Sequence, residues 1–334
     1  FIMKLNKLKI IILLFILVSA SVGMAKPRIV IGGNPYSMSP DVVVLQRIVM
    51  NANNVSAYFQ NTGIFDQNTT SGNTAGLEWP KGSGRTASFT AGLSIGCGIN
   101  GQYAQVMASY KGEYAPGHFK SDGTWETNND FKMYTVRLGD NATSNPDYAN
   151  WYKMVPYGAP YKDVNNNGQY DDGIDIPGMT NAGQTIFECM GDGDVSNRSP
   201  GEGFGGGINN PLLGAEIHFT AWAYTTPGLE DLQFINWNII NRGSVKWDST
   251  FMGVVVDPDL GDANDDYIGC DVTRNLAFCY NADNNDGTGA PPTYGAAPPA
   301  FGMDYFKSPI YKDPASPRFG DTLGLTSFVF FTNT

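Results

Sequence analysis

Hydrophobic and polar positions alternate with a period of two along much of the chain, and this alternation is typical of half-buried β-strands. The clearest run is Glu216 to Tyr224, in which every second side chain from Ile217 to Ala223 is apolar. Comparable runs cover Leu232 to Ile240 and Phe251 to Val256, and the turn-forming residues Asn241 to Ser244 separate those two. The pattern predicts three consecutive antiparallel strands.

A hairpin is predicted around Asn100-Gly101, because this dipeptide lies between the apolar runs Thr86 to Ile99 and Gln102 to Tyr110. Further strands are predicted at Ser56 to Gln60, Phe131 to Arg137, Thr185 to Met190 and Thr326 to Thr332. No long stretch has a sustained helical period with capping residues. We therefore predict an all-β, antiparallel β-sandwich-like architecture with long loops rich in glycine, asparagine and proline.

The N-terminal residues predict export. Lys4, Lys7 and Lys9 form a basic start, Ile10 to Val18 form an apolar run, and Gly23-Met24-Ala25 form a small-residue cleavage site. The apolar run is shorter than the ~20 residues that a membrane-spanning helix needs. We predict a signal peptide at residues 1–25, cleaved before Lys26, and a β-rich exported domain at residues 26–334. Two subdomains meeting near residues 140–180 are an alternative organisation, and we interpret the chain as truncated at its C-terminus.

The negative net charge of the chain argues against nucleic acids and anionic membranes as partners. The formal net charge is −11, and loss of the three lysines in residues 1–25 moves it to −14. Nucleic acids and anionic membranes attract clustered Lys and Arg, so neither is predicted as a partner. Because 42% of the residues are hydrophobic and 13% are aromatic, the chain can bury a core. An extracellular or outer-surface location follows from the export signal.

The four cysteines are Cys97, Cys189, Cys270 and Cys279. In an oxidising compartment they allow three pairings, and the short separation favours a disulfide between Cys270 and Cys279, with buried free thiols as the alternative. Zinc is not predicted, because no cysteine pair has ligand spacing and the only histidines, His118 and His218, are a hundred residues apart.

Three segments match enzyme motifs in part of their residue pattern, but each lacks the secondary structure or the residue that its motif requires. Gly92 to Gly96 fits G-x-S-x-G, but Ser94 falls inside a predicted strand instead of a strand-to-helix elbow. Gly201, Gly203 and Gly206 fit a dinucleotide-binding pattern, but Asn209-Asn210-Pro211 would stop the helix that must follow. Lys81 to Thr86 has an arginine where a phosphate-binding loop needs lysine. We interpret these segments as strand, loop and turn.

Four glutamates are candidates for a hydrolytic pair, which needs two carboxyl groups about 5 to 10 Å apart. They are Glu78, Glu188, Glu202 and Glu216. We favour the alternative that they are solvated or hydrogen-bonded, so no catalytic residue is assigned and enzymatic activity is left open. For a secreted hydrolase of polysaccharide or peptide, Glu202 and Glu216 are the acids to test.

The segment from Asp163 to Gly178, DVNNNGQYDDGIDIPG, has the spacing of a calcium-binding loop. Ca²⁺ takes oxygen ligands from positions 1, 3, 5 and 7 of such a loop, with glycine at position 6 for the turn. Asp163, Asn165, Asn167, Gly168 and Gln169 satisfy these positions. Position 12, normally an acid, is Ile174, and we predict that Asp171 or Asp175 replaces it. The alternative is an asparagine-rich turn with exposed acids.

A second acidic region covers Asp257 to Asp271 and Asn281 to Gly287. Its many carboxylates repel one another unless a cation lies among them. The candidate ligands of a second calcium ion are Asp257, Asp259, Asp262, Asp265 and Asp266. A solvated acidic loop is the alternative.

Five segments together resemble a family of uncharacterised exported proteins of the Bacteroidota and Chlorobi lineage. These segments are GLEWPKGSGRT (76–86), YGAPYKDVNNNGQYDDGIDIPG (157–178), DPDLGDANDDYIGCD (257–271), CYNADNNDG (279–287) and YGAAPPAFGMDYFKSPI (294–310). Members of this family commonly end in a sorting domain that the type IX secretion system reads, so the resemblance implies secretion by that system. This chain lacks the sorting domain, which agrees with our interpretation of the chain as truncated. The family's loops usually carry an acid at position 12, so Ile174 is a departure.

These observations predict a secreted or cell-surface bacterial protein, stabilised by structural Ca²⁺, that acts as a structural or binding module. Four aromatic residues, Trp222, Tyr224, Trp237 and Tyr267, are candidates for a face that binds an extracellular glycan or a surface protein. The alternative, which we favour, is that these rings form cross-strand packing pairs.

Overall fold

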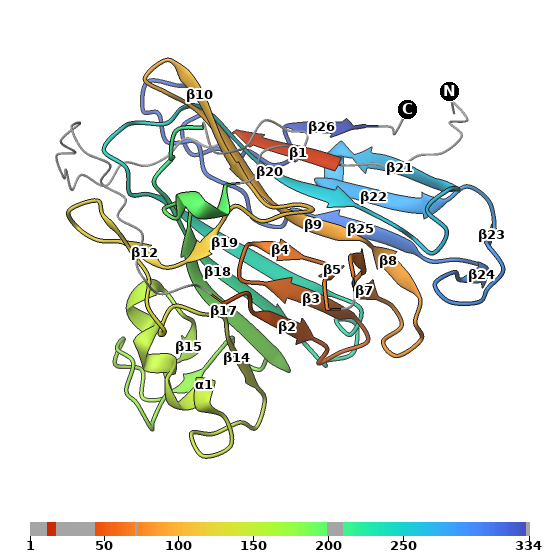
Figure 1. Ribbon diagram of the computed structural model, residues 1–334, viewed down its shortest axis with the longest axis horizontal. Helices are drawn as coiled ribbons and strands as arrows, with labels where there is room; N and C mark the ends of the chain where they lie inside the picture. The colour runs from red at the N-terminus through yellow and green to blue at the C-terminus, as the bar shows by residue number, and fades with distance from the viewer. Residues whose placement is uncertain (1–11, 18–43, 71, 199–209, 332–334) are drawn as a thin grey trace.

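The computed structural model describes residues 12–17, 44–70, 72–198 and 210–331. Within these ranges the protein is all-β, and every strand pairing is antiparallel (Figure 1). Two large sheets pack against each other, and this confirms the predicted antiparallel, β-sandwich-like architecture.

The first large sheet has ten strands in the order β26 (Ser327–Phe330), β1 (Ile12–Leu17), β20 (Asp248–Asp257), β9 (Thr90–Ile99), β4 (Ile64–Phe65), β3 (Ser56–Gln60), β7 (Leu77–Glu78) and β8 (Thr86–Ser88), with β10 (Gln102–Met107) on β9 and β2 (Arg47–Met50) on β3. The second has five strands in the order β11 (Ala115–Pro116), β17 (Gln184–Gly191), β18 (Ala215–Ala223) and β19 (Gln233–Asn241), with β14 (Tyr134–Arg137) on β17. A third sheet contains β21 (Asp266–Asp271), β22 (Leu276–Asn281) and β25 (Ala300–Asp304).

The remaining elements are short. Two-stranded sheets are formed by β5 (Gln67–Asn68) with β6 (Thr74–Ala75), β12 (His118–Phe119) with β13 (Trp125–Glu126), β15 (Tyr161–Lys162) with β16 (Ile176–Pro177), and β23 (Asn285–Asp286) with β24 (Gly295–Ala296). The helical elements are α1 (Pro146–Ala149) and the 3₁₀ turns η1 (Trp151–Lys153), η2 (Val155–Tyr157), η3 (Val195–Asn197) and η4 (Val272–Arg274). Among the described residues, no helix has the length and apolar character needed to cross a membrane.

The apolar run predicted as the centre of the signal peptide contributes β1 to the ten-stranded sheet. The backbone of Ile12 lies opposite Val256 of β20 and opposite Phe330 of β26. Most of residues 1–25 lie outside the described ranges. The signal peptide and its cleavage therefore stay predictions.

The predicted hairpin at Asn100-Gly101 is confirmed. Its strands are β9 and β10, with Gln102 opposite Ile99. Asn100 and Gly101 have φ angles of 52° and 77°, and a tight two-residue turn needs positive φ at both positions. Asn-Gly provides such a turn at little steric cost.

The three consecutive strands predicted from the alternation exist, but their predicted pairing is only partly right. β18 pairs with β19, whereas β20 pairs with β9 and β1 in the other sheet. Residues 242–247 connect β19 in the five-stranded sheet to β20 in the ten-stranded sheet. Within this connection the Trp247 indole N–H donates to the Leu213 carbonyl at 2.9 Å. Period two identifies a strand and its faces, but it does not identify the strand's partner.

The main core lies between the two large sheets. Phe219 of β18 meets Phe59 of β3 with ring centroids 5.9 Å apart, and Trp237 of β19 meets Phe65 of β4 at 6.2 Å. The inward residues of β18 are those that the alternation predicted, from Ile217 to Ala223, and they are buried in this core. This burial joins the sheets into one hydrophobic unit.

A second core covers the opposite face of the five-stranded sheet. Phe187 of β17 packs there with Trp151 and Met154, which residues 146–157 bring across the sheet. The Trp151 ring lies 6.2 Å from the Phe187 ring, and its indole N–H donates to the Pro160 carbonyl at 2.9 Å. This core supports the base of the candidate calcium loop.

The predicted disulfide between Cys270 and Cys279 is wrong, because all four cysteines are free thiols. Cys270 lies opposite Ala277, and Cys279 lies opposite Ile268, so the two cysteines are diagonal neighbours on β21 and β22. Diagonal residues of an antiparallel pair are about 7 to 8 Å apart, beyond the usual Cα separation of a disulfide. Cys97, Cys189 and Cys279 are buried, as the alternative predicted.

Candidate functional site

The predicted calcium loop closes between two short paired strands. β15 and β16 place Lys162 opposite Ile176, so the chain leaves and returns at one point. Asn166, Gly168 and Gly173 have positive φ angles of 58°, 78° and 80°, which asparagine and glycine tolerate best. The sequence thus folds residues 163–175 into a compact turn.

Asp163 organises the first half of this turn. Its Oδ2 accepts the Gly168 backbone N–H at 2.7 Å, and its Oδ1 accepts the Asn167 N–H at 3.2 Å. The Asn167 side-chain oxygen in turn accepts the Gln169 N–H at 2.8 Å. Oxygens at positions 1 and 5 therefore face the inside of the loop.

Asp171 closes the ring from the other side. Its Oδ2 accepts the side-chain N–H groups of Asn165 at 2.7 Å and of Asn167 at 2.6 Å. Asn165 Oδ1 accepts the Asn167 N–H at 3.2 Å, and Asn167 Oδ1 accepts the Gln169 N–H, so both amide oxygens face the backbone of the turn. Asp163, Asn165, Asn167 and Asp171 thus lie together in one hydrogen-bonded turn, and their binding of calcium stays a prediction.

Asp175 lies beneath the loop with 1% of its surface exposed. Its two carboxylate oxygens accept the Val164 N–H at 2.8 Å and the Asp171 N–H at 2.7 Å. The side chain of Ile174, in contrast, is 54% exposed. Of the two acids predicted to replace the one missing at position 12, Asp171 lies inside the ring and Asp175 lies at its base.

The second acidic region is divided between two environments. Asp257 ends β20, and its Oδ2 accepts the Tyr110 hydroxyl at 2.6 Å. Asp266 begins β21 with 4% exposure, and its Oδ2 accepts the Leu260 N–H at 2.9 Å. Burial and the nearby Asp259, Asp265 and Asp286 carboxylates raise the pKa of Asp266 to about 8.

Asp286 belongs to this region but was not predicted as a ligand. It is fully buried, and its oxygens accept the Asp262 N–H at 2.8 Å and the Tyr294 N–H at 2.5 Å. Within the described residues, no three carboxylates here bring oxygens within 4.8 Å of one another. The structure therefore gathers the region's acids without assembling the five-aspartate site.

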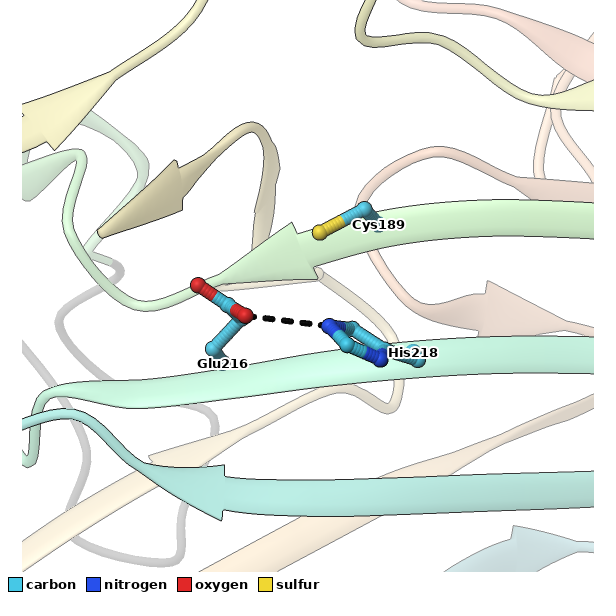
Figure 2. Close-up of side chains that lie close together, drawn as sticks. All are labelled: Cys189, Glu216 and His218. Atoms are coloured by element: carbon cyan, nitrogen blue, oxygen red, sulfur yellow. Dashed lines mark hydrogen bonds and ion pairs between the residues drawn. The ribbon is translucent and has the colours of Figure 1, made fainter. Parts of the chain in front are cut away.

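One cluster of possible metal donors does converge, and it contains Cys189, Glu216 and His218 (Figure 2). Cys189 lies opposite His218 on neighbouring strands, and Glu216 lies two residues before His218 on the same face. Their donor atoms lie within 4.8 Å of one another, and His218 Nε2 is 3.0 Å from Glu216 Oε1. All three side chains are buried.

The donors of this cluster are already occupied, so a metal ion fits it poorly. Burial acts to raise the pKa of Glu216, but hydrogen bonds from His218, Arg242 and the Phe119 N–H overcome it and lower the pKa to about 2. The Arg242 guanidinium lies 2.8 Å from the same oxygen that contacts His218. A cation there would be repelled by this guanidinium.

The thiol of Cys189 is equally unsuited to chemistry. It donates to the Gly117 carbonyl at 3.3 Å, and burial raises its pKa well above the ordinary value. Thiolates, not thiols, act as metal ligands and nucleophiles. The hydrogen bonds of the cluster therefore join β18 to Phe119 of β12 and to Arg242, and join β17 to Gly117.

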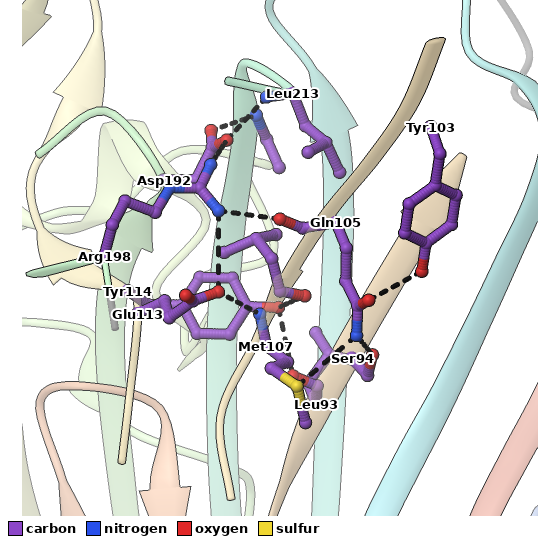
Figure 3. Close-up of polar contacts among 12 residues, drawn as sticks. Leu93, Ser94, Tyr103, Gln105, Met107, Glu113, Tyr114, Asp192, Arg198 and Leu213 are labelled. Atoms are coloured by element: carbon purple, nitrogen blue, oxygen red, sulfur yellow. Dashed lines mark hydrogen bonds and ion pairs between the residues drawn. The ribbon is translucent and has the colours of Figure 1, made fainter. Parts of the chain in front are cut away.

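A second buried charge network holds the segment that leads away from β17 (Figure 3). The Arg198 guanidinium donates to Asp192 at 2.9 Å and to the Gln105 carbonyl at 2.7 Å, and it lies 3.5 Å from Glu113. Burial raises the pKa of Asp192, while Arg198 and the backbone N–H groups of Leu213 and Ala215 oppose this rise. The network links Gln105 of β10 to Asp192, which follows β17. Asp192 in turn accepts the Ala215 N–H of β18, so the network joins β10 to β17 and β18.

The enzyme motifs do not acquire a catalytic context in the described residues. Ser94 lies in the middle of β9, where Gln105 Nε2 approaches its hydroxyl at 3.4 Å. Lys81 to Arg85 lies in the turn between β7 and β8, and Thr86 begins β8. Glu188 is buried in the five-stranded sheet, opposite Phe219, whose ring faces the main core. Glu202 and the glycine pattern at 201–206 lie outside the described residues.

Each of the four candidate aromatic residues packs against another ring or against the main core. Trp222 stacks on Phe234 with centroids 5.4 Å apart and an angle of 13°, and Tyr224 lies edge-on to Phe234. Trp237 packs against the main core. Tyr267 lies opposite Tyr280 at 5.9 Å on the third sheet.

Comparison of the chain with models of known protein families, with curated proteins and with solved structures finds no match. Any assignment of function therefore depends on the geometry described above.

Proposed function

We propose that this protein is an exported β module in which residues 163–175 bind a structural Ca²⁺ ion. The observation that supports this proposal is the ring formed by Asp163, Asn165, Asn167 and Asp171, closed at its base by Asp175. Carboxylate, amide and backbone carbonyl oxygens are the ligands that this hard ion prefers. Asp163, Asn165, Asn167, Gln169, Asp171 and Asp175 would hold it.

The ion's role would be to stabilise the fold. Tyr170 lies within the loop and packs against the second core, where its ring is 5.1 Å from that of Tyr161. Ordering the loop therefore also orders the cover of the five-stranded sheet. An extracellular calcium site with a Kd near 10⁻⁴ M gains about 1.4 kcal/mol of folding free energy at millimolar calcium.

The test is thermal unfolding of the purified protein in 1 mM CaCl₂ and in 1 mM EGTA. We expect calcium to raise the Tm by about 2 to 4 °C, and magnesium at the same concentration to have a smaller effect. Asp163→Ala should abolish the calcium-dependent shift. The matched control is Asp172→Ala, which changes an exposed aspartate of the same loop and should retain the shift.

An unchanged Tm in EGTA would sink the calcium proposal. Equal losses of the shift in Asp163→Ala and Asp172→Ala would show that calcium acts through general charge screening and not through this ring. Export is tested separately, by N-terminal sequencing of protein recovered from the medium or the cell surface, and we expect it to begin at Lys26.

The secreted hydrolase stays an alternative prediction, because Glu202 lies outside the described residues and Glu216 is poorly suited to act as an acid. Glu216, with its pKa lowered to about 2 and its contact with Arg242, is ionised at neutral pH and cannot serve as a general acid there. Turnover of a glycan or peptide that is lost in Glu202→Gln would support this alternative.

A further inference from the structure

Strand β19 ends the five-stranded sheet and pairs with β18 alone. The Arg242 N–H donates to the Gly214 carbonyl at 2.8 Å, and these two residues continue the register that sets Asn241 opposite Ala215. The direction of hydrogen bonding alternates along an antiparallel strand. Every second residue of β19 therefore directs its backbone N–H and C=O groups away from β18. These residues are Gln233, Ile235, Trp237, Ile239 and Asn241.

The outer edge of β19 is open in the part of the chain that the structure describes, because no described residue hydrogen-bonds to these outward-facing groups. Two other edge strands have carbonyls occupied by side chains. Gln105 of β10 accepts from Arg198 at 2.7 Å, and Val49 of β2 accepts from Gln184 Nε2 at 3.0 Å. Charged residues, proline and bulges also protect natural edges. The β19 sequence, QFINWNIIN, contains no charged residue or proline, and its pairing has no register shift.

The inward side chains of β19 are incompletely covered. Ile235, Trp237 and Ile239 pack against the main core, but all three are only partly buried. On the neighbouring strand β18, the inward residues Ile217 and Phe219 are 0% and 5% exposed. A strand added to the edge of β19 would cover the apolar surface that β19 leaves open.

The sequence of β19 is self-complementary about Trp237. When two copies of the strand pair antiparallel with Trp237 opposite Trp237, apolar residues meet apolar residues and polar residues meet polar residues. The outward-facing backbone groups of both strands also lie opposite one another. A two-fold contact requires such a surface, because both sides present the same residues. The facing pairs are Asn236 with Asn238, Ile235 with Ile239, Phe234 with Ile240, and Gln233 with Asn241.

We propose that β19 pairs antiparallel with β19 of a second copy of this chain, with the two-fold axis at Trp237. The five-stranded sheets of the two copies then form one continuous sheet. The charges beside β19 favour this direction, since Glu230 and Asp231 precede the strand and Arg242 follows it. Antiparallel pairing sets the acids of one copy near the arginine of the other, whereas parallel pairing brings like charges together.

This inference goes beyond the proposed function and does not depend on calcium. The contact lies at the edge of the five-stranded sheet, whereas the calcium loop lies between β15 and β16. Asp163→Ala should lose the calcium-dependent Tm shift and stay dimeric. The two proposals can therefore fail separately.

The test is sedimentation equilibrium of the purified protein in about 0.3 M NaCl, which screens the repulsion between two chains of net charge −11. We expect the mass of two chains. Asn236→Lys/Asn238→Lys places lysines opposite each other at exposed positions and should raise the Kd of the dimer about tenfold or more. The matched control is Asn129→Lys/Asn284→Lys, which adds the same charge at exposed asparagines outside β19 and should stay dimeric.

An exchange of charge tests the register of the contact. Asn236→Asp/Asn238→Asp should also weaken the dimer on its own, because like charges again lie opposite each other. Mixing this variant with the β19 lysine variant should restore the dimer, since each lysine then lies opposite an aspartate. Both variants should keep a Tm near the native value, because the two asparagines are exposed.

A native protein with the mass of one chain overturns the proposal. A native dimer whose Kd changes equally in the β19 lysine variant and in the control overturns it as well, since that dimer uses another surface. If the two charge variants retain the native Tm and their mixture forms no dimer, the two-fold pairing at Trp237 is wrong.

Discussion

The two acidic regions have similar compositions and opposite environments. In residues 163–175 the acids accept hydrogen bonds from backbone and side-chain groups of the same turn, and most of the turn is exposed. Around Asp266 and Asp286 the acids are buried at strand ends and crowd one another. The density of carboxylates in a sequence therefore does not determine whether those carboxylates are stabilised as anions.

The difference follows from the spacing of the residues. Alternate positions of a tight turn point to one centre, so Asp163, Asn165 and Asn167 share donors supplied within a few residues. Asp266 and Asp286 come from separate strands and meet only through the tertiary fold. Asp266 receives a single backbone N–H and lies near other carboxylates, so its burial favours the protonated form.

The largest expected effect is the loss of stability on replacing Asp175, which lies beneath residues 163–175. Asp175→Ala removes the acceptor of two hydrogen bonds and leaves the Val164 and Asp171 N–H groups without it, so we expect a loss of about 3 to 5 kcal/mol in the free energy of unfolding. The measurement is urea denaturation. Asp172→Ala, an exposed control in the same loop, should change stability by less than about 0.5 kcal/mol. Similar losses of unfolding free energy in both variants would show that the hydrogen bonds accepted by Asp175 do not stabilise the loop.

The second effect concerns pH and the buried Asp266. The pKa of its carboxyl is raised to about 8 in the folded protein but is about 3.9 in an unfolded chain. The stability that this group contributes is therefore complete below pH 4 and is lost as the pH rises through 8, by about 1 kcal/mol for each unit between pH 5 and 8. Asp266→Asn should flatten this part of the profile of unfolding free energy against pH.

Asp66 provides the matched comparison for this pH profile. Burial raises its pKa to about 7, so its contribution has the same sign and is lost over a lower range of pH. Asparagine also tolerates the positive φ of 65° at this position. Asp66→Asn should flatten the profile mainly below pH 7. If neither substitution changes the slope, these carboxyls are ionised in the native state.

The smallest expected effect is that of restoring the acid at position 12. The Ile174 side chain points to solvent, and Asp171 and Asp175 already lie inside and below the loop. Ile174→Glu should therefore change calcium affinity less than about threefold, as measured by isothermal titration calorimetry. A gain of tenfold or more would show that the native loop lacks a ligand.

Much of the fold follows from local signals in the sequence. The hairpin at Asn100-Gly101 and the buried face of β18 were predicted because turn chemistry and alternation are properties of neighbouring residues. The partner of β20 was not, because strand pairing depends on a crossing held by Trp247 and Leu213, which are distant from β9 in sequence. The disulfide prediction failed for the same reason, since it required the register between β21 and β22.

The same division applies to the candidate sites. The ring in residues 163–175 was predictable from spacing alone, including the closing role of Asp171. The period-two alternation also places Glu216 and His218 on one face, but the approach of Cys189 depends on the register of β17. Asp286 carries no local pattern that distinguishes it from other aspartates of the acidic loops.

Strand β17 is buried along all eight of its residues, because alternate side chains enter the two cores on its opposite faces. It is also hydrogen-bonded on both edges, to β18 on one side and to β14 and β11 on the other. We therefore expect its amides to exchange with deuterium only on global unfolding. Because β17 lies between both cores, stabilisation of residues 163–175 should slow the exchange of these amides although β17 lies outside that loop.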